Sequence, residues 1–255
     1  MEMHHHDVGV WGSWQLAPEI LLPIALITYL YWRLPSNSVS LRQRIFFYSG
    51  ILSALAVIVT PIGAQTMDYF SLHMVQHITL MMLTGPLLVL GTPNSFHPTH
   101  YLFKAVTHPA FSWLTYASLM IGVHLPVPHK FIMDNPWAHT FLEVPLYLLL
   151  PYFFYFNLLD RNLVNRRISP AMAVISLFLM MVPETLTGFF IYTAPGSIYH
   201  NMYSLNDQRQ GGSFMWAGAM IIDTVWMSFA VYHWIKSEEQ KSRDIDVEIA
   251  ANNDR

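Results

Sequence analysis

The chain has 255 residues, of which 53% are hydrophobic and only 11% are charged, and it contains no cysteine. Soluble domains usually carry about a quarter of charged residues, so this composition argues against a soluble protein. The net charge of -3 comes without a basic stripe, which argues against a nucleic-acid partner, and the absence of cysteine excludes disulfides and thiolate metal sites.

The first residues, MEMHHHD, open a segment rich in methionine and histidine that we expect to cover 1–15 on the outer side of a membrane. A histidine-rich tract can bind metal, although histidine runs are also purification tags. Three histidines are short for a tag, which favours a native and flexible capture segment. The segment precedes the first apolar run and carries Glu2 and Asp7 but no Lys or Arg, so that run is not expected to be a cleaved signal peptide.

Apolar runs that could cross a bilayer recur after this segment, and a crossing needs about 20 residues. Turn signals separate several of them, for example in GTPNSFHP and HLPVPHKFIMDNP. We therefore predict an all-α polytopic membrane protein, in which 16–236 form a bundle of seven transmembrane helices and 237–255 form a charged cytoplasmic tail, disordered or loosely helical. The spans lie at roughly 16–34, 44–64, 72–92, 109–126, 139–159, 170–192 and 212–235.

The basic residues predict the orientation of these spans, because Lys and Arg are enriched in cytoplasmic loops. Of the 13 Lys and Arg residues, all except Lys130 and Arg209 fall on one side of the predicted membrane. We therefore expect the N-terminus outside and the C-terminus in the cytoplasm.

The histidines divide between the two sides of this topology. The inner side receives His97, His100, His108 and His233. Histidine is a common metal ligand, although a single histidine is as readily explained by tolerance at a membrane interface. The outer set comes from different loops and helix ends that the fold could gather into one site. Its members are His4, His5, His6, His73, His77, His124, His129, His139 and His200.

The third span begins with the most specific pair, in SLHMVQH. Four residues of helix turn about 400°, so the rings of His73 and His77 share one face, about 6 Å apart along the axis. Met81 continues this stripe and Met74 lies beside it, and imidazole with thioether suits copper, especially Cu(I). Methionines are also common packing residues. We interpret Met82 as packing and leave both interpretations open for Met74 and Met81.

Two other site classes compete for this pair. The zinc-protease motif H-E-x-x-H supplies a glutamate as general base, and Met74 occupies that position here, so we expect no hydrolytic enzyme. A haem needs axial histidines that face each other from two helices. His73 and His77 on one helix cannot both bind one haem, although either could pair with His124 or His139.

Spans four and five place further candidates at the same depth. His124 ends the fourth span and His139 starts the fifth, so we predict both as metal ligands together with His73. Glu143, one turn after His139, could orient that ring from the second shell or complement the charge of the helix N-terminus. Asp68, one turn before His73, could be an oxygen ligand or a helix cap.

Two acidic residues, Glu184 and Asp223, fall near the middle of the last two spans. Each would cost about 2.5–3.5 kcal/mol at the centre of a membrane if left unpaired. No Lys or Arg lies at matching depth, so the carboxyl groups are either protonated or bonded to hydroxyl groups. They could form a path for a proton or a cation, or only a structural hydrogen bond.

Three stretches carry a family resemblance: HMVQHITLMMLTGPLLVLGTP, VHLPVPHKFIMDNPWAHTFLE and DQRQGGSFMW. They resemble CtaG-type cytochrome c oxidase assembly factors, multi-spanning membrane proteins of bacteria that are associated with the maturation of haem–copper oxidases. The resemblance runs from the first span to the last. It implies a bacterial plasma membrane location, oxidase subunits as partners within the lipid bilayer, and Asp207 as a further second-shell residue.

We therefore predict an assembly factor without catalytic turnover that binds copper, as Cu(I) or Cu(II), at an outer-face His/Met site and assists metallation of the oxidase. One alternative is a permease for copper or another cation that uses Glu184 and Asp223. The other is a haem-binding membrane redox protein. The permease lacks a continuous polar stripe through the spans, and the haem protein lacks facing histidines at mid-membrane depth.

Overall fold

The computed structural model describes residues 14–93, 96, 100–159, 168–200 and 202–253. Within these ranges the chain forms helices and turns and no strand. The predicted metal-capture tract at residues 4–6 lies outside the described residues. The α-helices are α1 (Pro18–Trp32), α2 (Leu41–Ile58), α3 (Pro61–Ala64), α4 (Phe70–Ile78), α5 (Gly85–Leu90), α6 (Tyr101–Val106), α7 (Pro109–Gly122), α8 (Pro126–Asp134), α9 (Pro136–Ala138), α10 (Val144–Leu159), α11 (Pro170–Thr193), α12 (Leu205–Ser213) and α13 (Ala219–Asn253). The π-helical segments are η2 (Thr79–Thr84), η3 (His139–Glu143) and η4 (Phe214–Gly218).

Several of these helices begin at local signals in the sequence. The side chains of Ser40, Ser169 and Ser204 each accept a hydrogen bond from the backbone N–H three residues later. Ser40 also forms a capping box with Gln43. Such caps satisfy N–H groups that the first turn of a helix leaves without a partner.

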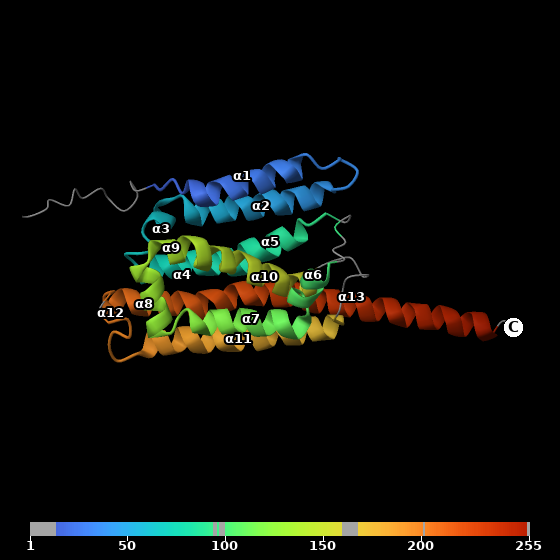
Figure 1. Cartoon of the computed structure of the whole chain (residues 1–255). Coiled ribbons are helices and arrows are strands. Elements are labelled where there is room, and N and C mark those ends of the chain that lie inside the picture. The colour runs from blue at the N-terminus through green and yellow to red at the C-terminus, as the bar shows by residue number, and fades with distance from the viewer. Residues whose placement is uncertain (1–13, 94–95, 97–99, 160–167, 201, 254–255) are drawn as a thin grey trace, which may run out of the picture.

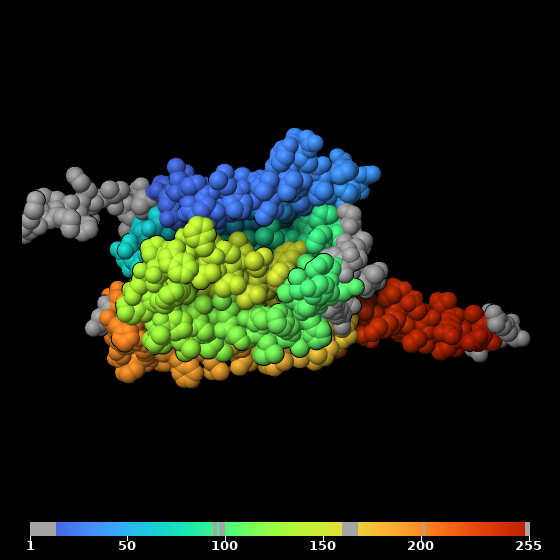
Figure 2. Space-filling view, in the orientation of Figure 1, coloured from blue at the N-terminus to red at the C-terminus, as the bar shows by residue number. Residues whose placement is uncertain are grey.

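The helices lie roughly along one direction in an elongated bundle (Figure 1). One end carries α3, α8 and α12, and α13 runs out beyond the other end (Figures 1 and 2). The predicted charged tail therefore continues the last helix, whose residues beyond 237 are mostly exposed. We name the end with α3, α8 and α12 the site end, because the residues described below come from elements near it.

Five helical stretches are long and apolar enough to cross a membrane, and a sixth crossing results if α7 and α8, bent by 78°, form one broken span. These helices indicate a multi-pass membrane protein. The first span was predicted at roughly 16–34, but the helix formed there, α1, has only 15 residues, fewer than a crossing needs. By length and composition, therefore, fewer helices qualify as membrane spans than the seven predicted. The orientation of the spans stays a prediction. The five stretches are Leu41–Ile58, Phe70–Leu90, Pro136–Leu159, Pro170–Thr193 and Leu205–Asn252.

A π-helical segment interrupts three of these stretches, and a proline accounts for the first interruption. Pro86 has no N–H, so the carbonyl of Met82 loses its usual partner four residues on. The indole N–H of Trp226 donates to that carbonyl at 2.7 Å. Short π-helical segments inside helices occur frequently at functional sites.

Close backbone contacts hold α12 against its neighbours. A Cβ atom added to Gly212 would lie 2.6 Å from the backbone nitrogen of Tyr192 on α11, so only glycine permits this approach. A Cβ atom on Gly211 would lie 2.3 Å from a ring carbon of Phe70 on α4. From α12, the carboxylate of Asp207 accepts hydrogen bonds from the backbone N–H groups of Phe70, at 2.7 Å, and Ser71, at 3.2 Å. These contacts fix the start of α4, which carries the first site histidines.

Candidate metal centre

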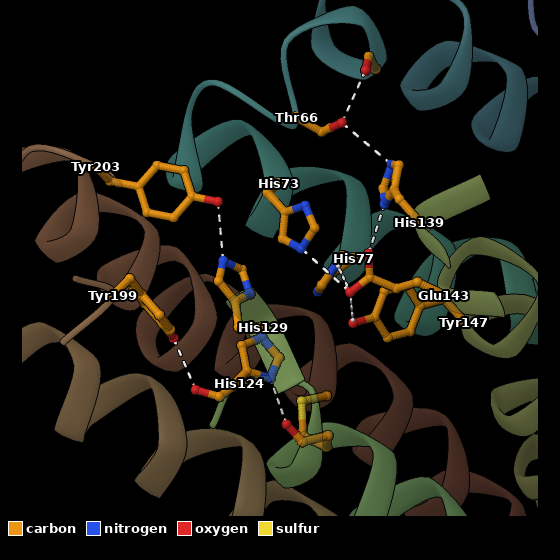
Figure 3. Close-up of polar contacts among 12 residues, drawn as sticks. Thr66, His73, His77, His124, His129, His139, Glu143, Tyr147, Tyr199 and Tyr203 are labelled. Atoms are coloured by element: carbon orange, nitrogen blue, oxygen red, sulfur yellow. Dashed lines mark hydrogen bonds and ion pairs between the residues drawn. The ribbon is translucent and has the colours of Figure 1, made fainter. Parts of the chain in front are cut away.

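Five imidazole rings gather around one carboxylate near the site end of the bundle (Figure 3). All six side chains are buried. They come from elements far apart in the sequence, so only the fold brings them together. The group, which we name the His cluster, consists of His73 and His77 from α4, His124 after α7, His129 from α8, and His139 and Glu143 from η3.

Glu143 lies at the centre of this cluster. Its Oε2 atom lies 2.7 Å from Nδ1 of His139. Its Oε1 atom lies 3.5 Å from Nε2 of His73 and 3.5 Å from Nε2 of His77. The hydroxyl group of Tyr147, one turn further along the helix, donates to the same Oε1 atom at 2.9 Å. The carboxylate thus faces α4 as well as its own helix.

The local geometry of η3 places His139 and Glu143 side by side. They are four residues apart on one helical face, and the other ring nitrogen of His139 lies 3.4 Å from the hydroxyl of Thr66. That hydroxyl donates to the carbonyl of Gly63, which anchors it in the turn before α4. The His139 ring is therefore held between Glu143 and this turn.

Several buried ring nitrogens in the cluster have no hydrogen-bond partner in the described part of the chain. They are both nitrogens of His73, both nitrogens of His77, Nε2 of His124 and Nδ1 of His129. About 90% or more of buried polar groups in proteins are hydrogen-bonded, so each exception needs an explanation such as an ion or a water molecule. Imidazole nitrogens without protein partners fit metal ligation.

The tautomer of His124 follows from its contacts. Its Nδ1 atom donates to the carbonyl of Met120, one turn earlier, so in the neutral ring the Nε2 atom carries the lone pair. The hydroxyl of Tyr199 donates at 3.1 Å to the backbone carbonyl of His124. Burial raises the pKa of Tyr199 above its usual value, so that this hydroxyl keeps its proton. His124 is thus held with its Nε2 lone pair available to a ligand.

His129 occupies the far side of the cluster. Its Nε2 atom lies 3.0 Å from the hydroxyl of Tyr203, and its ring centroid lies 5.4 Å from that of His73. Burial raises the pKa of Tyr203 above its usual value, so this hydroxyl remains a hydrogen-bond donor. His129 therefore lies behind His73 and packs against it.

Three members of the cluster are arranged to hold one ion. One ligand atom each from His73, His139 and Glu143 lies within 4.8 Å of the others, and all three residues are buried. Two imidazoles and one carboxylate form a donor set that suits zinc, copper or ferrous iron. A buried carboxylate is costly without a positive partner, and none of its observed contacts is with Lys or Arg. The residues therefore fit a divalent cation.

The structure brings some of the predicted site residues together and separates others. His73, His77, His124 and His139 meet as members of the His cluster. Met74 and Met81 are buried on the side of His77 that faces the centre of the bundle. Asp68 is exposed at the surface before α4. Asp207 contacts backbone groups at the start of α4, so it acts as a cap for that helix.

Three residues of this region were not predicted from the sequence, either as metal ligands or as residues that orient a ligand. His129 is the nearest, and the bend of 78° after α7 returns it to the cluster. The sequence feature that could have indicated His129 is HLPVPH, in which two prolines separate it from His124. Tyr147 and Met120 lie four residues from Glu143 and His124 respectively, and that helical spacing is their signal.

The two acidic residues predicted in mid-membrane lie close together on α11 and α13. Glu184 and Asp223 are both buried, and they interact with each other. The hydroxyl of Tyr116 donates to Oε1 of Glu184 at 3.2 Å, which confirms a hydroxyl partner for this carboxyl group.

Comparison with known proteins gives two matches. A family model described as "Cytochrome c oxidase caa3 assembly factor" matches residues 25–237. The chain is also similar to a protein of Mycobacterium leprae (strain TN) named "Uncharacterized protein ML1998", with 24% identity over 204 residues. That alignment covers 67% of this chain and 31% of the relative, so the chain spans under a third of that protein. No solved structure matches.

Proposed function

Because this chain belongs to the cytochrome c oxidase caa3 assembly factor family, we propose that it assists metallation of the oxidase by binding copper in the His cluster. The cluster holds copper as cargo and performs no catalytic turnover. Its partners are subunits of a haem–copper oxidase in a bacterial plasma membrane.

One observation carries this proposal: a buried carboxylate faces imidazole nitrogens that form no hydrogen bond to a described residue. Glu143 is 1% exposed, and His73 is 0% exposed with both ring nitrogens lacking a hydrogen bond to any described residue. Leaving polar groups in this state costs free energy, on the order of 1–3 kcal/mol for each group. A bound cation would supply both the missing partners and the missing charge.

The chemistry of the donors favours copper among the divalent ions. Sites built from nitrogen and oxygen bind first-row divalent ions in an order that peaks at Cu(II). The chain has no cysteine, so no thiolate holds the ion. Soft ions bind less tightly without thiolates, and a delivery protein must release what it binds.

The arrangement of the basic residues supports an outer position for the cluster. Lys130 on α8 and Arg209 on α12 lie near the site end, whereas Lys104 on α6 lies at the other end (Figure 1). Lys236 and Lys241 belong to the part of α13 that leads out of that other end. Under the positive-inside rule the site end is then extracytoplasmic, with the C-terminus in the cytoplasm.

The dense packing of the cluster argues against the haem alternative. The ring centroids of His73 and His77 are 3.9 Å apart, and those of His77 and His124 are 5.6 Å apart. The cavity beside His77 and His124 has a volume of about 10 Å³, which is far too small for a porphyrin. The permease alternative rests on Glu184 and Asp223, and the hydrogen bond from Tyr116 to Glu184 also explains that carboxyl group as structural.

The test is copper per chain, measured by elemental analysis on protein purified in detergent. His4, His5 and His6 are replaced by alanine throughout, so that this tract does not contribute. The test variant is His73→Ala/His139→Ala, and His108→Ala, which alters an exposed histidine outside the cluster, is the control.

Copper content that falls in the test variant and not in the control, with loss of oxidase maturation in cells carrying the test variant, supports the proposal. Unchanged oxidase maturation with the double variant contradicts it. The absence of copper from the intact protein would also contradict the proposal. The protein could then assist oxidase assembly only through protein contacts.

A further inference from the structure

A small cavity lies next to the His cluster on the side that faces the centre of the bundle. Its volume is about 10 Å³, which is about the space needed to hold one water molecule. It can therefore hold one ion and no larger ligand. Its walls include the side chains of Met74, Met81, Met82, Met120 and Met215.

Methionines alone would indicate packing, because they commonly fill irregular gaps in protein cores. Three polar residues, His77, His124 and Glu184, also contribute to its walls, although the surface that lines the cavity is apolar. Nε2 of His124, both ring nitrogens of His77 and Oε2 of Glu184 form no hydrogen bond to the residues that the structure describes. These three side chains are at least nine-tenths buried. Buried polar groups without a hydrogen bond need an explanation beyond packing, such as an ion.

The helices place sulfur and nitrogen donors next to each other along the walls. Met74 and Met81 lie three residues before and four residues after His77 on the stretch formed by α4 and η2. Met120 lies four residues before His124, and its carbonyl holds the Nδ1 proton of that ring. The Nε2 lone pair of His124 is therefore available where the methionines gather.

The donors here differ from those around Glu143. His73, His139 and Glu143 offer two nitrogens and a charged oxygen, which suits a divalent ion. The cavity offers neutral imidazole nitrogens and thioether sulfurs, which suit Cu(I). His77 adjoins both groups, since its ring centroid lies 3.9 Å from that of His73.

We propose that this methionine-lined cavity is a second metal site, which binds Cu(I) through His77, His124 and thioether sulfur from Met74, Met81 or Met120. The proposal deepens the proposed copper-handling function, because it assigns an oxidation state to a site of its own. The carboxyl group of Glu184, held by the hydroxyl of Tyr116, lines the same cavity.

The test uses Ag(I), which has the charge and softness of Cu(I) and is not oxidised in air. The full chain in detergent, with Met3→Leu and residues 4–6 changed to alanine, is titrated with Ag(I) and separately with Cu(II). The test variant is Met74→Leu/Met81→Leu/Met120→Leu, which removes sulfur at nearly constant volume. The control is Met180→Leu, a buried methionine that does not line the cavity.

We expect the triple variant to bind Ag(I) about tenfold more weakly or worse, and to bind Cu(II) as the parent does. Met180→Leu should change neither. Glu143→Gln should show the reverse pattern, with weaker Cu(II) binding and unchanged Ag(I) binding. Equal Ag(I) affinity in the triple variant and its parent overturns the second site.

X-ray absorption of the Cu(I)-loaded parent protein gives a second test that needs no folded variant. The chain has no cysteine, so any sulfur neighbour of copper must be a methionine. Sulfur neighbours support the cavity site, and a shell of nitrogen and oxygen alone overturns it. Failure of the proposed assembly function has a different readout. Oxidase maturation would then be normal with His73→Ala/His139→Ala, whether or not X-ray absorption detects sulfur next to copper.

Discussion

Nδ1 of His139 lies 2.7 Å from Oε2 of Glu143, and both residues belong to one π-helical segment. The other oxygen of the same carboxylate faces His73 and His77 on a different helix. Glu143 therefore connects two helices and is the centre of the cluster. The sequence suggested that Glu143 orients His139, which is only one of the contacts that its carboxylate makes.

Glu143→Gln should weaken Cu(II) binding by about tenfold to a hundredfold, the usual effect of losing a group that binds or orients at a metal site. The amide keeps the size of the side chain but removes its charge. Competition titration with a chelator of known affinity measures the change. Glu238→Gln, which alters an exposed residue of the α13 tail, is the matched control and should bind Cu(II) as the parent does.

The stability of Glu143→Gln without metal should show whether the substitution acts on metal binding or on folding. Without metal, Glu143→Gln should unfold at a temperature equal to or above that of the parent, because it removes a buried charge. A lower unfolding temperature would show that Glu143 stabilises the metal-free fold through its histidine contacts. Thermal unfolding in detergent, followed by circular dichroism in the presence of chelator, distinguishes the two outcomes.

Metal should stabilise the parent protein more than Glu143→Gln, in which the weaker binding predicted above leaves about 0.4–1.4 kcal/mol at the same metal concentration. A ligand that binds only the folded state at 100 times its Kd adds about 2.7 kcal/mol to the free energy of unfolding. Unfolding temperatures with Cu(II) and after chelation measure this difference. An equal shift in the parent and in His73→Ala/His139→Ala would assign the stabilising ion to another site.

Gly211→Ala should disturb the start of α4, because the added Cβ would lie 2.3 Å from a ring carbon of Phe70. Phe70 is fully buried, so the helices must separate, at a cost of about 1–3 kcal/mol or more. Gly218→Ala is the matched control, because a Cβ there meets nothing within 4 Å. Only the first substitution should lower the unfolding temperature and the copper content.

Asp207→Ala should destabilise the protein by about 0.5–2 kcal/mol, since it removes the cap that α12 provides for α4. Copper affinity should fall less than in Glu143→Gln, because Asp207 contacts backbone groups and no ring of the cluster. The control is Asp134→Ala, which breaks an exposed pair with Lys130 and should cost under about 1 kcal/mol. Chemical or thermal unfolding measures both.

Local spacing made part of the site predictable. His73 and His77 are one helical turn apart, and so are His139 and Glu143, and the geometry of a helix places such pairs on one face wherever the helix lies. Composition and apolar run lengths likewise indicated a helical membrane protein, because only helices and closed barrels satisfy the backbone within a membrane.

Other features depended on contacts between distant segments. The bend after α7 places His129 in the cluster, and no local sequence pattern predicts the angle of that bend. Asp68 and Asp207 both looked like site residues, yet one is exposed and the other caps α4 from α12. Spacing along a chain does not say which neighbouring helix a side chain meets.

The sequence by itself determined the helical membrane class, the histidine pairs and the absence of thiolate ligands, because these follow from composition and from the fixed period of a helix. Only the tertiary structure decided that a carboxylate lies among five imidazoles, and that methionines surround a cavity beside them. The His cluster forms where side chains from α4, the turn after α7, α8 and η3 meet, and the cavity forms where α4, η2 and α7 meet α11 and η4. Such meetings are set by the packing of whole helices.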